Sequence, residues 1–144
     1  MNARVAAISL LGGCVYFLVV FGAGMVLGTV RTLLVAPRLG EAAAVALELP
    51  IMLAISWIAS SKTVRYFGVP GTTPARVLTG GLALLLLLCA EVGVSVIAFG
   101  RTVSAHFADY LETGTQLGLL GQVAFALFPL VQARRARATG PPGL

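Results

Sequence analysis

The sequence contains few charged residues: Asp, Glu, Lys and Arg together make up 10% of its 144 residues. A water-soluble domain carries about a quarter charged residues, because its surface faces water. Hydrophobic residues, by contrast, account for 58% of the chain. This shortage of charge excludes a water-soluble globular domain and indicates that lipid surrounds most of the protein.

The chain is also poor in the side chains that bind metals and haem. It has one histidine, His106, and two cysteines, Cys14 and Cys89, which both lie inside apolar runs. A haem with two axial histidines is therefore excluded, and no Cys/His cluster is spaced for zinc. Because His106 has only Asp109 and Glu112 as acidic neighbours, we expect no metal and no cofactor.

Lys and Arg outnumber Asp and Glu by 10 to 5. These basic residues stand singly or in short groups at the ends of apolar runs, and form no patch with aromatics. Such placement is typical of a membrane protein, so we expect the lipid bilayer, and no nucleic acid, as a partner. The sequence contains no Walker loop, GxSxG or HExxH motif, and we therefore expect no enzyme.

Four apolar runs are long enough to cross about 30 Å of hydrocarbon as helices. The sequence therefore predicts an all-α, integral membrane four-helix bundle with up-down topology. The short connections predict that consecutive helices are antiparallel neighbours. The C-terminal residues have no apolar face, which is typical of a disordered tail. The expected spans cover residues 5–30, 42–60, 77–100 and 114–131, the bundle 1–131, and the basic tail 132–144.

The basic residues also predict an orientation. Positive charge is retained on the cytoplasmic side of a membrane. The N-terminus, second connection and C-terminus hold most of it, so we expect both termini to be cytoplasmic in a bacterial inner membrane. The residues on that side are Arg4, Lys62, Arg65, Arg76, Arg134, Arg135 and Arg137, against Arg31, Arg38 and Arg101 on the other.

Three polar side chains on different spans fall at one depth. At 1.5 Å per helical residue, Glu48, Glu91 and Gln122 lie about 10, 13 and 12 Å below the outer face. Arg31 stands at the outer end of the first span, and its long side chain can reach down to them. A carboxylate in hydrocarbon requires a partner, so we expect Arg31 to pair with one glutamate and Gln122 with the other.

This polar layer has two interpretations. Ionisable residues inside a span are functional candidates by default, but polar side chains also hold helices together through hydrogen bonds. Two further features lie nearby. Pro50 cannot donate a helical hydrogen bond, which predicts a kink in the second span beside Glu48. Gly24 and Gly28 form a small-xxx-small pair, which predicts a packing face inside the chain or in a dimer.

The run RTLLVAPRLGEAAAVALELP, residues 31–50, resembles small uncharacterised four-span bacterial inner-membrane proteins. The resemblance covers the first two spans and implies no activity. Small multidrug-resistance transporters are similar in having four spans and a membrane glutamate. Their essential glutamate lies in the first span, however, and the first span here contains no acidic residue.

Two functions therefore stay open from the sequence. The first is a non-catalytic accessory, assembly or structural component of the inner membrane, whose partner is a larger membrane complex or a second copy of the chain. The second is a small homo-oligomeric transporter, or a proton- or cation-coupled permease, in which Glu48 and Glu91 form the intramembrane site.

Overall fold

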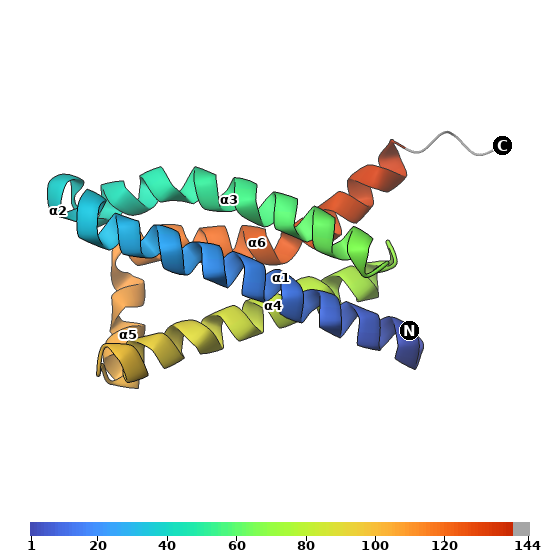
Figure 1. Ribbon diagram of the computed structural model, residues 1–144, viewed down its shortest axis with the longest axis horizontal. Helices are drawn as coiled ribbons and strands as arrows, with labels where there is room; N and C mark the ends of the chain where they lie inside the picture. Colours follow the sequence, from blue (N-terminus) through green and yellow to red (C-terminus); the bar gives the residue numbers. More distant parts are fainter. Residues whose placement is uncertain (140–144) are drawn as a thin grey trace.

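The computed structural model of the protein describes residues 1–139, without the side chains of His106 and Tyr110. It is all-helical over these residues, and four helical segments are long and apolar enough to cross a membrane, which confirms the all-α multi-pass prediction. Two of the long helices, α1 and α4, are each continued directly by a π-helical segment of their own. The elements are α1 (Ala3–Val30) with π-helix Arg31–Val35, α2 (Ala36–Leu39), α3 (Glu41–Tyr66), α4 (Thr73–Gly93) with π-helix Val94–Ala98, α5 (Val103–Ala108) with a 3₁₀ turn (Asp109–Leu111), and α6 (Thr113–Ala138) (Figure 1).

The four long helices form a ring in which α1 and α6 each pack against both α3 and α4. The start of α1 and the end of α6 lie at the same end of the bundle, opposite α2 and α5 (Figure 1). The expectation that all consecutive helices are neighbours is wrong for α3 and α4, which occupy opposite corners. The connection from α3 to α4 therefore runs diagonally across the end of the bundle, and α4 packs against α1 and α6 rather than against α3.

Glycine conformations mark two of the helix boundaries. Gly40 has φ +80° and separates α2 from α3, a value that side chains with a Cβ rarely adopt. Gly68 has φ +64° and follows α3, where its N–H donates to the Arg65 carbonyl at 3.2 Å. Between these glycines α3 runs without interruption through Pro50, so Pro50 lies inside the helix. The kink predicted there stays a prediction.

The C-terminal boundary corrects the expected tail. Helix α6 continues to Ala138, so residues 132–138, expected to be disordered, are helical. Contacts with α3 explain this extension. The Gln132 amide accepts from Ser60 at 2.9 Å and donates to the Trp57 carbonyl at 2.8 Å, and the Arg135 guanidinium lies 5.2 Å from the Trp57 ring centroid. Residues 140–144 of the expected tail lie outside the described residues.

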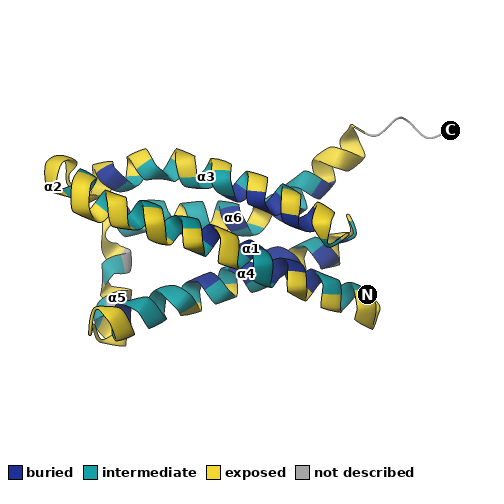
Figure 2. Ribbon diagram, in the orientation of Figure 1, coloured by how far each residue is buried: buried dark blue, intermediate teal, exposed yellow. Residues whose placement is uncertain are grey.

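The half of the bundle that holds the start of α1 and the end of α6 is closely packed, and we call it the closed half. Figure 2 shows buried residues gathered where α1 crosses α4. Glycines allow this approach: a Cβ at Gly13 would lie 2.8 Å from the Thr79 carbonyl oxygen, and one at Gly80 would overlap the Ala126 carbonyl of α6. The central cluster contains Tyr16, Val20, Ala59, Ala83, Leu87 and Phe125.

A proline in α6 is stabilised by a side chain from α1. Pro129 lies inside α6 and has no N–H, so the Phe125 carbonyl four residues earlier lacks its helical donor. The fully buried Tyr16 hydroxyl donates to that carbonyl at 2.9 Å, and the Tyr16 and Phe125 rings stack with centroids 4.3 Å apart. Figure 1 shows α6 bending away from the bundle towards its C-terminal end.

Candidate functional site

A cavity of about 670 Å³ occupies the half of the bundle that ends at α2 and α5, and we call this the cavity half. Residues from α1, α3, α4 and α6 all line the cavity. Its inner end is mostly apolar, apart from the buried Ser56, and adjoins the central cluster, while the charged side chains lie towards α2 and α5. The apolar floor includes Phe21, Met52, Leu87 and Phe125.

Glycines on two helices leave room for this cavity. Gly24 and Gly28 of α1 line it, and so do Gly114, Gly118 and Gly121 of α6. Spacings of three or four residues place each set on one face of its helix. A Cβ at Gly28 or Gly118 would meet no described atom within 4 Å, so these two positions leave space open, whereas one at Gly114 or Gly121 would meet α3.

The outer part of the site contains an arginine shared by two carboxylates. Arg31 Nε lies 2.7 Å from a Glu48 carboxylate oxygen, and Arg31 Nη1 contacts Glu41. The side chains of Arg31 and Glu48 are 23% and 17% exposed, whereas that of Glu41 is 55% exposed. Arg31 is the first residue of the π-helical segment that continues α1. One guanidinium therefore compensates the half-buried Glu48 and contacts a second carboxylate at the rim.

The deeper part of the site joins α4 to α6. The Gln122 amide nitrogen donates to a Glu91 carboxylate oxygen at 2.6 Å. This bond and the Arg31–Glu48 pair are the two pairings that the depths in the sequence predict. The Gln122 carbonyl oxygen is buried and has no hydrogen-bond partner among the described residues. A charged Glu91 fixes this amide orientation, because a rotated amide would present its oxygen to the carboxylate.

Ser95 lies one helical turn beyond Glu91 and also lines the cavity. It is only 7% exposed, and its hydroxyl finds no hydrogen-bond partner in the described part of the chain. Ser95 belongs to the π-helical segment Val94–Ala98. Such segments are rare and occur frequently at functional sites. Both π-helical segments of the described chain lie in the cavity half, and each contributes a polar side chain to the site.

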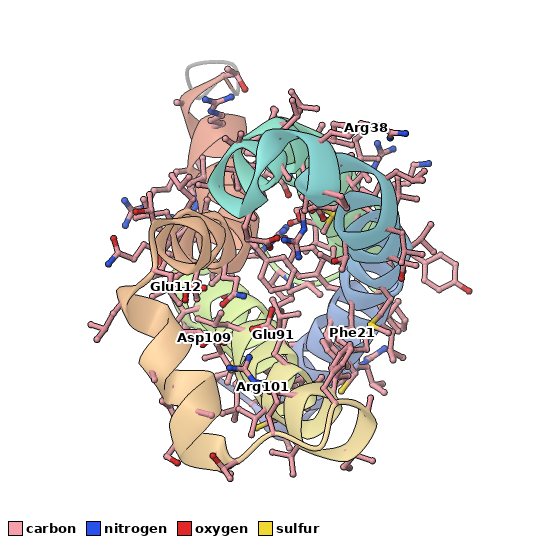
Figure 3. The ribbon with its side chains drawn as sticks, turned by 90° about the vertical axis from the view of Figure 1, so that its left-hand side faces the viewer. Phe21, Arg38, Glu91, Arg101, Asp109 and Glu112 are labelled. Atoms are coloured by element: carbon pink, nitrogen blue, oxygen red, sulfur yellow. The ribbon has the colours of Figure 1, made fainter. Side chains whose placement is uncertain are left out.

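The connection after α4 supplies a second ion pair to the lining. Arg101 and Asp109 form a two-point hydrogen-bonded pair in which the Arg101 Nη2–Asp109 Oδ1 distance is 2.9 Å. The hydrogen bond to Asp109, together with its charge, raises the pKa of Arg101 above its ordinary value. Figure 3 views the bundle from this end, with Glu91, Arg101 and Asp109 near the central space and Arg38 directed outward.

The charges that line the cavity are unequal. Its acidic residues are Glu41, Glu48, Glu91 and Asp109, and its basic residues are Arg31 and Arg101. With every group ionised, the described residues of the lining carry four negative and two positive charges. Arg101 pairs with Asp109, and Arg31 pairs with both Glu41 and Glu48. The site can therefore take up a cation, or a proton, without exceeding neutrality.

Sequence reasoning placed some features of the site wrongly and missed others. Gly24 and Gly28 do not bring two helices together inside the chain: a Cβ at Gly24 would meet only the Met52 methyl, at 3.5 Å, and one at Gly28 would meet no described atom within 4 Å. Their role in a dimer face stays a prediction. Ser95 and Arg101 were missed as site residues. The spacing of Ser95 one turn from Glu91 was a signal that could have found it.

The geometry of the chain is the evidence for its function, since no family model, curated protein or solved structure matches it.

Proposed function

We propose that the chain is a bacterial inner-membrane protein with four up-down spans and cytoplasmic termini. The ends of the helices support this orientation. The end with the start of α1 and the end of α6 holds seven basic residues, and the end with α2 and α5 holds three. A protease-cleavable tag at the C-terminus should be cut in inside-out vesicles and protected in right-side-out vesicles. The reverse pattern would contradict the orientation.

We further propose that the protein is a small permease that binds a cation or a proton in its cavity. The single observation that carries this proposal is the cavity itself, in which acidic groups lie about 10–13 Å below the outer face. Ionisable residues at such depth are costly and mark ion pathways in membrane proteins. No chemical step is part of the proposal, and the protein acts without catalysis or a cofactor. Because four helices barely enclose a path, a homo-oligomer is the proposed working unit.

The test is ion flux in liposomes that contain the purified protein and a pH-sensitive dye. Wild-type protein should dissipate an imposed pH or cation gradient faster than empty liposomes. The Glu48→Gln/Glu91→Gln double variant should lose this flux. Glu112→Gln is the matched control, because it makes the same change at an exposed residue outside the cavity lining. Equal flux from wild type and the double variant would exclude the permease.

A non-catalytic accessory or assembly component of a larger complex is the competing proposal. Gly22 and Gly81 support it, because a Cβ at either position would meet nothing described within 4 Å, which leaves room for another helix. Under this proposal a stoichiometric membrane partner should co-purify in a mild detergent, as measured by native mass spectrometry. The Glu48→Gln and Glu91→Gln variants should then keep that partner. A homogeneous chain that retains flux without a partner would contradict it.

A further inference from the structure

The two halves of the bundle differ in how the amide of one glutamine and the hydroxyl of one serine are bonded. In the closed half, Gln132 uses both ends of its amide, and the buried Ser60 hydroxyl donates to it. In the cavity half, the Ser95 hydroxyl and the Gln122 carbonyl oxygen have no such partner within the described residues. A buried polar atom without a hydrogen bond costs free energy. A ligand that bonds to both atoms would remove that cost.

These two atoms lie beside a carboxylate. Gln122 is hydrogen-bonded to Glu91, and Ser95 follows Glu91 by one turn, in the π-helical segment that continues α4 and lines the cavity. Ser95 and Glu91 are therefore neighbours on the helix surface, roughly 6 Å apart. The three groups offer a negative charge and oxygen acceptors. Their natural complement is a positively charged group with several N–H donors.

The size and the apolar lining of the cavity indicate what kind of molecule carries the positively charged group. The volume of about 670 Å³ falls in the range of small-molecule sites. Much of the lining is apolar, including Phe21, Met52 and Phe125 at the floor. A bare metal ion would leave this apolar volume empty, and an anion would face an excess of carboxylates. An organic cation fills the volume and can also contact the aromatic rings.

We propose that the Glu91–Ser95–Gln122 group binds the ammonium of a protonated primary amine whose apolar body fills the cavity floor. The inference rests on the proposed function only in treating the cavity as a ligand site. It names Glu91 as the charge that the amine meets, because the Gln122 amide contacts Glu91 and Ser95 lies one helical turn from it in the cavity lining. Ser95 and Gln122 supply the acceptors for the ammonium N–H groups.

The test uses three probes with the same apolar body and different head groups: 1-adamantylamine, 1-adamantanol and 1-adamantanecarboxylate. Binding is measured calorimetrically to the full-length protein in zwitterionic nanodiscs, with empty nanodiscs subtracted. The amine should bind at least about tenfold more tightly than the alcohol, because only the amine meets Glu91 with a charge. The carboxylate should not bind. Equal binding of the amine and the alcohol would overturn the inference.

Variants assign the binding to the proposed residues. Glu91→Gln should weaken amine binding by more than about tenfold, and Ser95→Ala by about fivefold, the value of one hydrogen bond. Glu48→Gln should have a smaller effect than Glu91→Gln, and Glu112→Gln none. Ser95→Ala removes no described hydrogen bond, so it keeps the test valid even if Glu91→Gln fails to fold. Amine affinity unchanged in Ser95→Ala would overturn the assignment of Ser95.

The two proposals can fail separately. Loss of flux in Glu91→Gln liposomes, without any amine binding to wild type, would retain the permease and overturn the amine inference. Amine binding that depends on Glu91, without any flux, would retain the inference and exclude the permease.

Discussion

Two glutamines on α6, ten residues apart, show how the halves of the bundle differ. Gln132 in the closed half uses both its amide oxygen and its amide nitrogen, on Ser60 and on the Trp57 carbonyl. Gln122 in the cavity half uses its nitrogen on Glu91, and its buried oxygen has no partner in the described chain. Polar groups in the closed half hold helices together. In the cavity half, the Ser95 hydroxyl and the Gln122 oxygen are the acceptors for the proposed amine.

One buried side-chain atom of the closed half also lacks a hydrogen-bond partner among the described residues. Arg76, in the closed half, has one guanidinium nitrogen without a partner among the described residues. Its other nitrogens donate to the carbonyls of Pro70 and Val69, at 3.0 and 3.1 Å. Arg76 lies at the start of α4, at the end of the bundle assigned to the cytoplasmic side.

The largest expected effect breaks the closed half at its tightest contact. Gly80→Ala places a methyl group against the Ala126 carbonyl of α6, which should destabilise the protein by about 3 kcal/mol. Gly81→Ala is the matched control, since the adjacent position has no described atom within 4 Å. Its effect should stay within about 1 kcal/mol, as helix propensity allows. Unfolding in SDS, followed by circular dichroism, measures both. Similar losses in the two variants would refute the packing argument.

The next effect concerns the bond between Tyr16 and the Phe125 carbonyl. Tyr16→Phe leaves that buried carbonyl without a donor and should cost about 1–2 kcal/mol in the same unfolding measurement. Pro129→Ala restores the helical N–H. In that background Tyr16→Phe should therefore cost much less. A double-mutant cycle with no coupling between the two positions would show that the hydroxyl does not compensate the proline.

A matched pair of serines sharpens the comparison between the halves. Ser60→Ala removes a hydrogen bond to Gln132 and should cost about 1 kcal/mol. Ser95→Ala removes a buried hydroxyl that has no described partner, so its effect on stability should be neutral or slightly favourable. Thermal unfolding in one detergent measures both variants. A larger loss from Ser95→Ala than from Ser60→Ala would contradict the assignment of the halves.

The smallest effect is expected outside the spans. Asp109→Asn removes the exposed ion pair with Arg101, which should leave stability nearly unchanged because solvent screens such a pair. The pKa of Arg101 is raised, so its charge is fully present below its ordinary pKa and is lost only at still more alkaline pH. Wild-type stability should accordingly be insensitive to Arg101 between pH 7 and 9. Limited proteolysis after α4, with and without salt, checks the pair. A large stability loss would show that it supports the bundle.

Several features could be predicted because they depend on length and depth alone. Apolar run length gave the four spans, and residue counting placed Glu48, Glu91 and Gln122 at one level. The Tyr16–Phe125 bond was predictable in part, since Pro129 necessarily leaves the Phe125 carbonyl without its helical donor. That signal was present in the sequence and was missed.

The arrangement of the helices could not be predicted in the same way. The diagonal placement of α3 and α4 depends on which glycines find a partner, and nothing in the local sequence distinguishes Gly80 from Gly81. The π-helical segments have no clear propensity signal either. The cavity could not be predicted either. Its lining includes glycines of α1 and α6, and these come near each other only through the arrangement of the four helices.

Thiol labelling tests the difference between the halves most directly. Ser95→Cys and Ser60→Cys are each made in a Cys14→Ala/Cys89→Ala background and treated with aminoethyl methanethiosulfonate, a cationic reagent that carries a primary amine. The thiol at position 95 should react at least about tenfold faster than that at position 60, faster than with an anionic sulfonate reagent, and more slowly once 1-adamantylamine is present. Equal rates at the two positions, or no preference for the cationic reagent, would contradict a cation site in the cavity half.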